Sequence, residues 1–214
     1  MKNPKKIFIW GVGGHGRTLL DIFNKGKKYK VAYFVDDNPA LKGKIIQGVK
    51  VIGGQEALAD MKKNGINSGI AGIGDCKKRC EIFRIMKQSG FSFVNAIDPS
   101  AIISKTAKIG EGVTIWPGAV INTNAVVGDN VIINETATIS HDDVIGFGSH
   151  IAAGVNLIGG LKIGEKTLIG VGAVIICKKI GSNSVIGAGS VVANDIGDNV
   201  VAIGFPARVV GKRN

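Results

Sequence analysis

The chain has few cysteines, prolines and aromatic residues. Of its 214 residues, 3 are Cys, 5 are Pro and 6% are aromatic. Three scattered cysteines cannot form a disulfide framework, and no neighbouring side chains complete a metal-ligand spacing, so we expect free thiols and no metal centre. Cys76, Cys80 and Phe83 fall at i, i+4 and i+7, which indicates one buried face of a helix.

Long apolar runs are also missing. No stretch approaches the ~18 consecutive apolar residues that a spanning helix needs, so we expect no membrane span although the mean hydropathy is +0.24. The start MKNPKKIFIW has the basic beginning of a secretion signal, but its apolar run stops at GVGGHGR without a small-residue cleavage site. We therefore expect a cytoplasmic protein whose apolar residues form an internal core.

Acidic residues are scarce in the first part of the chain. Residues 1–95 carry 18 Lys and Arg against 7 Asp and Glu, whereas residues 96–214 carry 9 of each, so the whole net charge of +11 belongs to the first part. This excess fits either a solvated basic surface or a ligand with phosphates. Nucleic acid is a weaker explanation because the lysines are dispersed and no aromatic residues are interleaved with them, and we expect no nucleic-acid partner.

Glycine is abundant, with 32 residues, and it accompanies an internal repeat. Every sixth residue from position 97 is aliphatic at fourteen consecutive positions: Ile97, Ile103, Ile109, Ile115, Ile121, Val127, Ile133, Ile139, Ile145, Ile151, Leu157, Ile163, Ile169 and Ile175. The frame shortens by one residue at Lys178 and Lys179 and resumes at Ile180. Three such hexads form one triangular coil of a parallel β-helix with stacked aliphatic side chains, so we expect about five coils over residues 96–214.

Residues 1–95 show a different pattern, in which apolar runs alternate with amphipathic stretches. This order predicts a small Rossmann-like parallel α/β domain. Strands are expected at residues 7–10, 31–35, 49–52, 69–73 and 91–97, and helices after the first glycine turn and at residues 55–63 and 76–87.

The glycine turn after the first expected strand reads Gly11-Val12-Gly13-Gly14-His15-Gly16, which fits G-x-G-x-x-G, and Asp36 and Asp37 follow about twenty residues later. Such glycines let the backbone approach a diphosphate at a helix N-terminus, and the acidic pair can accept hydrogen bonds from hydroxyls. An α/β region of about 95 residues is half a dinucleotide fold and favours a single nucleotide. The alternative is that the glycines only make a tight turn.

The repeat region contains two histidines, His141 and His150, and neither occupies an inward position of the hexad. A near-neutral base suits acyl transfer because the nucleophile loses a proton during attack, and Asp142 could orient the imidazole. Neighbouring side chains on a strand face apart, so this pairing requires a corner at residues 141–142. The hexad pattern gives no reason for a carboxylate at Asp143, where other hexads have small residues.

The basic α/β part with GVGGHG and FVDD, followed by hexads containing NETATISHDDVIGFGSHIAAGV, resembles the bacterial nucleotide-aminosugar N-acetyltransferases and their relatives, the sialic acid O-acetyltransferases. The resemblance covers essentially the whole chain. It implies a left-handed β-helix, a homotrimer with active sites between subunits, and acetyl-CoA as the donor. Two positions depart from the pattern: the family commonly has cysteine where Asp143 stands and Glu where Asp142 stands.

The resemblance also implies roles for individual residues. His141 matches the general base, Asp142 the acidic residue that raises its basicity, and Asn134 an asparagine near the acceptor amine. The positions expected to contact acetyl-CoA are His150, Gly159, Val171 and Ala188. Those expected to hold the nucleotide sugar are Gly13, Gly14, His15, Asp36, Asp37 and Gly74.

The expected function is therefore acetyl-CoA-dependent N-acetylation of a nucleotide-linked amino sugar for bacterial glycan biosynthesis, with a UDP-linked 4-amino-4,6-dideoxy sugar as the favoured substrate. Residues 1–95 would bind the nucleotide sugar and residues 96–214 would carry the transferase site. Two alternatives remain at this point. One is O-acetylation of a sialic-acid-type sugar, and the other is a β-helix binding or scaffold protein without catalysis.

Overall fold

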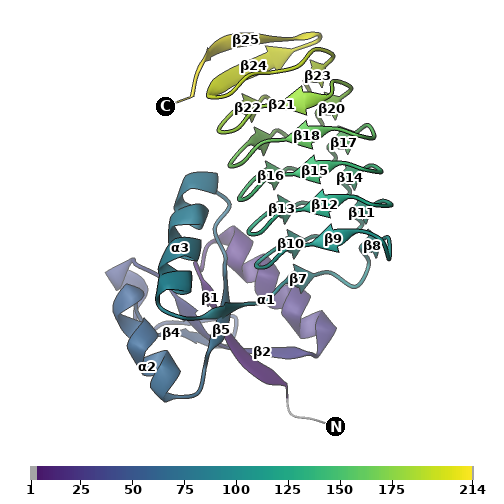
Figure 1. The fold of residues 1–214 in the computed structure, drawn as a ribbon. Coiled ribbons are helices and arrows are strands. Elements are labelled where there is room, and N and C mark those ends of the chain that lie inside the picture. Colours follow the sequence, from purple (N-terminus) through teal and green to yellow (C-terminus); the bar gives the residue numbers. More distant parts are fainter. Residues whose placement is uncertain (1–3, 214) are drawn as a thin grey trace. The chain divides into compact units, whose positions relative to one another are not determined.

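The computed structural model describes residues 4–213 of the chain. The chain divides into two compact units after Pro99, a few residues beyond the boundary expected at 95/96. The first unit is an α/β layer structure and the second is a stack of short strands (Figure 1). Among the described residues, no helix has both the length and the apolar character that a membrane crossing requires.

The first unit is built on one twisted sheet with the strand order β3-β4-β2-β1-β5-β6. The pairings β1–β2, β1–β5, β2–β4 and β5–β6 are parallel, and only the short β3 runs antiparallel to β4. The chain leaves β1 toward β2 on one side and later returns to β5 on the other, so the strand order reverses between β1 and β5. The strands are β1 (Lys5–Trp10), β2 (Tyr29–Val35), β3 (Ile45–Ile46), β4 (Val49–Val51), β5 (Ser68–Ala71) and β6 (Ser92–Phe93).

Three helices flank this sheet: α1 (Gly14–Gly26), α2 (Leu58–Lys63) and α3 (Cys76–Gln88) (Figure 1). Short 3₁₀ turns precede α2 at Gln55–Ala57 and follow β2 at Pro39–Leu41. Asp75 caps α3 by accepting a hydrogen bond from the Lys78 N–H at 2.8 Å, which satisfies one of the free amides of the first turn. The predicted helix face of Cys76, Cys80 and Phe83 is confirmed, because all three side chains are buried.

The second unit consists of two-residue strands stacked in three parallel sheets, which is consistent with the predicted left-handed β-helix. The strands that follow one another along the chain belong to successive sheets, so each turn of the chain visits all three. The first sheet holds β10 (Thr114–Ile115), β13 (Ile132–Ile133), β16 (His150–Ile151), β19 (Leu168–Ile169) and β22 (Val185–Ile186). The second holds β8 (Ile102–Ile103), β11 (Val120–Ile121), β14 (Thr138–Ile139), β17 (Asn156–Leu157), β20 (Val174–Ile175) and β23 (Val191–Val192). The third holds β9 (Lys108–Ile109), β12 (Val126–Val127), β15 (Val144–Ile145), β18 (Lys162–Ile163) and β21 (Lys179–Ile180).

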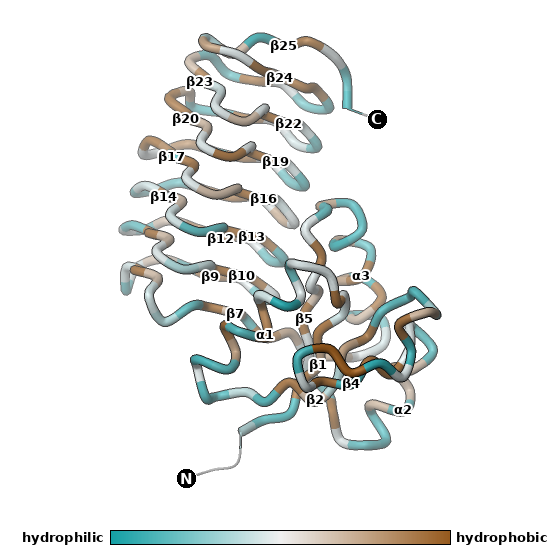
Figure 2. The backbone as a smooth tube through the Cα atoms, turned by 180° about the vertical axis from the view of Figure 1, so that it is seen from behind, coloured by the Kyte–Doolittle hydropathy of each residue, from teal (hydrophilic) through white to brown (hydrophobic). Residues whose placement is uncertain are grey.

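The inward residues of the hexads form one continuous apolar core from Val113 to Ala207. Apolar and polar stretches alternate along each coil (Figure 2). The predicted frame shift is confirmed, because Ile180 pairs with Ile163 one coil earlier. Ile97 is an exception to the predicted column: it lies in β7 (Ala96–Ile97) of the first unit and is 37% exposed.

The C-terminal segment closes the stack. β24 (Val200–Gly204) pairs in parallel with β22, and β25 (Ala207–Lys212) folds back antiparallel on β24. Ala202 and Ala207 join the apolar core, so the hairpin covers the last coil.

Candidate active site

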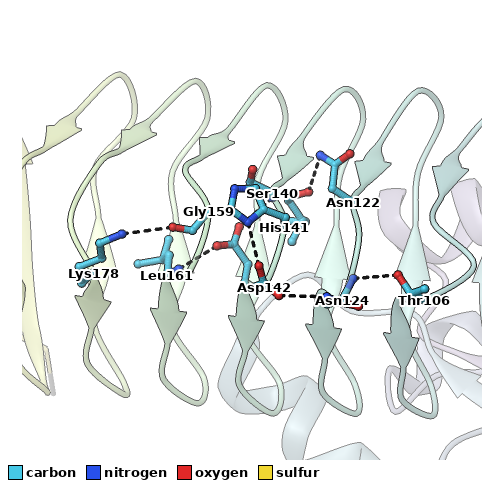
Figure 3. Close-up of polar contacts among 11 residues, drawn as sticks. Thr106, Asn122, Asn124, Ser140, His141, Asp142, Gly159, Leu161 and Lys178 are labelled. Carbon is cyan, nitrogen blue, oxygen red and sulfur yellow. Dashed lines mark hydrogen bonds and ion pairs between the residues drawn. The ribbon is translucent and has the colours of Figure 1, made fainter.

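His141 and Asp142 lie together at the corner between the second and third sheets, between β14 and β15. Asp142 has a φ of 59°, and this left-handed conformation turns the chain so that adjacent side chains meet. The His141 Nδ1 lies 2.8 Å from the Asp142 Oδ2 (Figure 3). Because an ionised carboxylate only accepts, Nδ1 carries the proton and Nε2 keeps its lone pair. The hydrogen bond from His141 is the largest cause that lowers the pKa of Asp142, and the bond from Asn124 adds to it.

Asn124 supports Asp142 from the preceding coil. Its side-chain Nδ2 donates to the Asp142 Oδ1 at 3.2 Å, and its backbone N–H donates to the Thr106 Oγ1 at 3.0 Å (Figure 3). A line of hydrogen bonds therefore runs along this corner through three coils to the imidazole. Sequence reasoning missed Asn124, although a spacing of 18 residues, which is one full coil, places it directly beside Asp142.

Gly159 lies beside the imidazole in the next coil. A Cβ atom at this position would collide with the Nε2 and Cε1 atoms of His141, so only glycine leaves room for the ring. The Gly159 carbonyl accepts a hydrogen bond from the Lys178 Nζ at 3.3 Å, while its N–H donates to none of the described residues. The site thus pairs a basic nitrogen with an available amide donor.

Asp143 follows the pair but faces the interior and is fully buried. Its Oδ2 accepts from the Ser140 N–H at 2.7 Å, and its Oδ1 accepts from the Leu161 N–H at 2.9 Å. Burial raises the pKa of this carboxyl, and the two amide donors oppose that rise.

His150 and Asn134 meet on a different side of the coil. His150 lies in β16 of the first sheet, and its Nε2 is 2.9 Å from the Asn134 Oδ1. Asn134 follows β13 and also donates from Nδ2 to the Glu135 Oε2 at 3.2 Å. The structure brings these two predicted residues together, but within one chain it does not bring them to the corner that carries His141.

Val171 and Ala188 share the corner between the first and second sheets, where the Gly189 N–H donates to the Val171 carbonyl at 2.8 Å. Val171 is 57% exposed and Ala188 is exposed. Gly159 lies at the corner between the second and third sheets instead. These three of the four positions expected to contact acetyl-CoA are therefore not contiguous within a single chain.

The predicted nucleotide residues of the first unit gather at the carboxyl ends of β1, β2 and β5. Gly13 and Gly14 follow β1, with Gly13 as the N-cap residue of α1, and Gly74 follows β5. No atom lies within 4 Å of a Cβ placed on any of these three glycines, so the backbone is open to a close approach. The reversal of strand order between β1 and β5 is the usual place for a ligand in an open parallel sheet.

Other glycines of the motif have a packing role. A Cβ on Gly11 would lie 2.8 Å from the Gly72 carbonyl oxygen, and Gly11 has a φ of 113°. A Cβ on Gly16 would collide with the Gly11 carbonyl oxygen. The two ends of the glycine turn therefore pack tightly, as the tight-turn alternative expects, and its middle stays open. His15 is half-buried in the first turn of α1.

Asp36 and Asp37 behave differently from each other. Both Asp36 carboxylate oxygens accept backbone hydrogen bonds at 3.0 Å, one from Val12 and one from Asn38, so this residue ties the glycine turn to the end of β2. Asp37 is exposed and lies 3.9 Å from the Lys78 Nζ. Both line a cavity of about 370 Å³ together with Pro39, Lys42, Gly53, Gly54, Gln55 and Glu56.

Much of the basic excess does not line this crevice. Lys5 and Lys6 begin β1, and Lys28 and Lys30 lie at the beginning of β2, which places them at the opposite edge of the sheet. Lys6 and Lys30 are even paired across the two strands. At the carboxyl ends of the strands, Lys42 pairs with Glu56 at 3.3 Å and Lys78 lies 3.9 Å from Asp37. These four lysines therefore lie away from the predicted nucleotide residues.

No group of three or more His, Cys, Asp or Glu side chains suited to a metal ion occurs among residues 4–213.

Comparison with known proteins places the chain in a family. The crystal structure of PerB from Caulobacter crescentus in complex with CoA and GDP-perosamine is 37% identical, with a TM-score of 0.91, over 96% of this chain and 97% of that one. The chain belongs to the hexapeptide-repeat nucleotide-sugar N-acetyltransferases. The acetyltransferase domain of PglB from Neisseria gonorrhoeae, in complex with acetyl coenzyme A, is 30% identical with a TM-score of 0.88, over 97% of this chain and 100% of that one.

Separate matches to each unit agree with this family. The PglD N-terminal domain matches residues 6–86, and the bacterial transferase hexapeptide (six repeats) matches residues 96–141. The curated UDP-N-acetylbacillosamine N-acetyltransferase of Bacillus subtilis (strain 168) is 33% identical over 115 residues, which is 52% of this chain and about half, 51%, of that protein. Membership in this acetyltransferase family confirms the predicted enzyme class.

Proposed function

We propose that the protein transfers the acetyl group of acetyl-CoA to the amino group of a nucleotide-linked amino sugar. The observation that carries this function is the His141–Asp142 pair beside the amide of Gly159, in a chain similar over almost its full length to an enzyme solved with CoA and GDP-perosamine. The open crevice at Gly13, Gly14 and Gly74 supports the nucleotide part.

His141 acts as the general base in this reaction. As the amine nitrogen attacks the thioester carbonyl carbon, Nε2 accepts the proton that the amine loses, while Nδ1–H stays bonded to Asp142. The C–S bond then breaks, and the proton passes from the imidazolium to the departing sulfur. Asp142 stabilises the imidazolium between these two steps, and general-base help of this kind contributes about 10² to 10⁴ in rate.

Gly159 supplies the second group at the reacting carbonyl. Its N–H is not used by the described residues, and it lies beside the ring that removes the proton. We assign this amide to the carbonyl oxygen, where negative charge develops as the amine attacks. Val171 and Ala188, exposed along another corner, are assigned to the extended arm of acetyl-CoA together with His150, and Asn134 to the acceptor amine.

A substrate panel tests the function. We expect thiol release from acetyl-CoA with UDP- or GDP-linked 4-amino-4,6-dideoxy sugars, and none with the corresponding 4-hydroxy sugar nucleotides or with free sialic acid. The comparison of UDP and GDP forms identifies the nucleobase, since one relative is named for a UDP-linked sugar and another was solved in complex with a GDP-linked sugar. Acetylation of sialic acid in preference to every amino sugar would instead support an O-acetyltransferase.

Substitution of Gly13 by alanine is expected to raise KM for the nucleotide sugar about tenfold or more and to leave KM for acetyl-CoA unchanged. Gly13 has an ordinary φ of −64°, and its Cβ would project into open space, so the fold is retained while the phosphate approach is blocked. Gly26→Ala, at the other end of the same helix and equally open, is the matched control and leaves both KM values unchanged. An equal change in the two variants would contradict the assignment.

The separation of predicted site residues over two corners supports a homotrimer in which neighbouring chains complete each site. His141 lies at one corner, whereas Asn134, His150 and Val171 lie on another side of the coil. Ile176 and Val171, 46% and 57% exposed, are apolar residues that such an interface would cover. Light scattering is expected to give a mass near three times 22.3 kDa.

Mixed assemblies provide the sharper test of this arrangement. His141→Ala and His150→Ala chains are each expected to be weakly active alone, but each mixed ring contains one interface with both histidines intact. Random 1:1 mixing in a closed trimer then restores about one quarter of the wild-type activity. If the site lies within one chain, co-expressed variants show only the sum of their separate residual activities.

We place the reaction in the cytoplasm and its product in bacterial glycan biosynthesis. The support for the compartment is that Cys76, Cys80 and Cys177 are buried and form no disulfide within the described residues, as expected where thiols stay reduced.

A further inference from the structure

The buried carboxylate beside the catalytic pair has no role in the proposed reaction. Asp143 is fully buried, directly after the His141–Asp142 pair. In the neighbouring coils the equivalent position holds Ala125 and Leu161, which need no polar partner. A buried carboxylate is costly unless it is hydrogen-bonded, so its two amide contacts define what it does.

These contacts replace the regular backbone pattern of the coils. One coil earlier, the Asn122 N–H donates to the carbonyl of Ile139 at 3.0 Å, and the Ala125 N–H donates to the carbonyl of Asn122 at 3.3 Å. At the His141 corner, the equivalent Ser140 N–H donates to Asp143 instead, and so does the Leu161 N–H of the following coil. Accordingly, β14 pairs with β17 at one residue, whereas it pairs with β11 at two.

The carboxylate thereby joins the two turns that form the site. Oδ2 of Asp143 closes the turn of residues 140–143, which carries His141, and Oδ1 holds Leu161 at the end of the turn of residues 158–161, which carries Gly159. The His141 ring lies directly against Gly159. The relative position of these turns therefore sets where Nε2 stands with respect to the Gly159 amide.

We propose that Asp143 is a positioning residue of the acetyl transfer, which fixes the turn of the base against the turn that supplies the amide donor. This inference rests on the proposed function. The ionised carboxylate fits the role because it accepts at both oxygens, whereas an asparagine amide would direct its NH₂ group at one of the two N–H donors.

Asp143→Ser is the test variant. Serine and threonine already occupy the equivalent buried position of other hexads at Ser149, Thr167 and Ser184, so the coil accepts a hydroxyl there. We expect kcat to fall about 10- to 100-fold, because misplacement of a catalytic group by about 1 Å has an effect of that size. KM for both substrates should change less than about twofold, because neither binding surface is altered. Asp143→Asn should lose at least as much kcat.

Ser184→Ala is the matched control. The Ser184 hydroxyl also joins two coils, donating to the Gly197 carbonyl at 2.8 Å and accepting from the Val200 N–H at 3.2 Å, but at a corner without site residues. It should lower the melting temperature and leave kcat per folded enzyme unchanged. Amide hydrogen exchange gives a second readout, and Asp143→Ser should accelerate exchange at Ser140 and Leu161.

Wild-type kcat in Asp143→Ser would overturn the positioning role. So would a loss of activity that is fully explained by a smaller amount of folded protein, with kcat per folded enzyme unchanged as in Ser184→Ala. Either outcome can be measured only if the wild-type enzyme acetylates a nucleotide amino sugar. If the wild-type enzyme turns over none of them, it is the proposed function that fails.

Discussion

His141→Ala is expected to lower kcat by at least about 100-fold, the lower end of what a general base contributes. The imidazole presents a basic nitrogen to the site, since Nδ1 is held by Asp142 and Nε2 faces Gly159. Its side chain is 66% exposed and outside the apolar columns, so the melting temperature should not change. Steady-state kinetics with saturating amino sugar and acetyl-CoA measures the effect.

Lys105→Ala is the control for this variant, because Lys105 occupies the same exposed turn position two coils earlier. It should retain wild-type kcat. Asp142→Asn should cost less than His141→Ala, since it removes the partner of the base and leaves Nε2 in place. Turnover of His141→Ala at the wild-type rate would exclude this residue as the base.

The fold of the repeat region could be predicted because it follows from one requirement, the burial of an aliphatic side chain at every sixth position. Each coil buries residues such as Ile121, Ile139 and Leu157 in a column, and no other arrangement accounts for an aliphatic residue at every sixth position. The same period, counted as 18 residues per coil, also places Asn124 beside Asp142 and Gly159 beside His141. Both neighbours were thus available from the sequence, although only Gly159 was assigned.

Contacts that depend on local backbone conformation could not be predicted in this way. Strand alternation alone would turn His141 and Asp142 apart, and it is the left-handed φ of Asp142 that brings them together. Asp143 is harder still, because its role depends on two amides that regular pairing would have used. The contact of Asn134 with His150 is diagonal across two coils, at a spacing of 16 residues rather than 18.

Net charge was the least informative signal in the first unit. The sequence allowed either a phosphate ligand or a solvated surface, and the strand directions decide between them for Lys5, Lys6, Lys28 and Lys30. These residues lie at the amino ends of parallel strands, whereas ligands bind at the carboxyl ends. The net charge does not say at which end of the strands the charges lie. The glycine motif does, because it directly follows β1 and so marks the carboxyl end of that strand.

The second large effect is expected at a residue with no side chain. In Gly159→Ala, the new Cβ collides with the imidazole of His141, so the ring must leave its position. We expect kcat to fall by about 100-fold or more, the effect of displacing a catalytic group by about 1 Å, with KM for both substrates little changed. The alanine retains its backbone N–H, so the loss is attributable to the displaced base rather than to a missing donor. Gly197→Ala, whose Cβ would meet no atom within 4 Å, is the control in the same solenoid and should keep wild-type kcat.

A double-mutant cycle isolates this cause. If Gly159→Ala acts only by moving the imidazole, it has nothing left to move in a His141→Ala background, where the new methyl group occupies the vacated space. The double variant should then be as active as His141→Ala alone, with a coupling as large as the single effect of Gly159→Ala. Multiplication of the two losses would instead show that the methyl group obstructs the reacting carbonyl itself, and the contact between the ring and Gly159 would no longer explain why this position requires glycine.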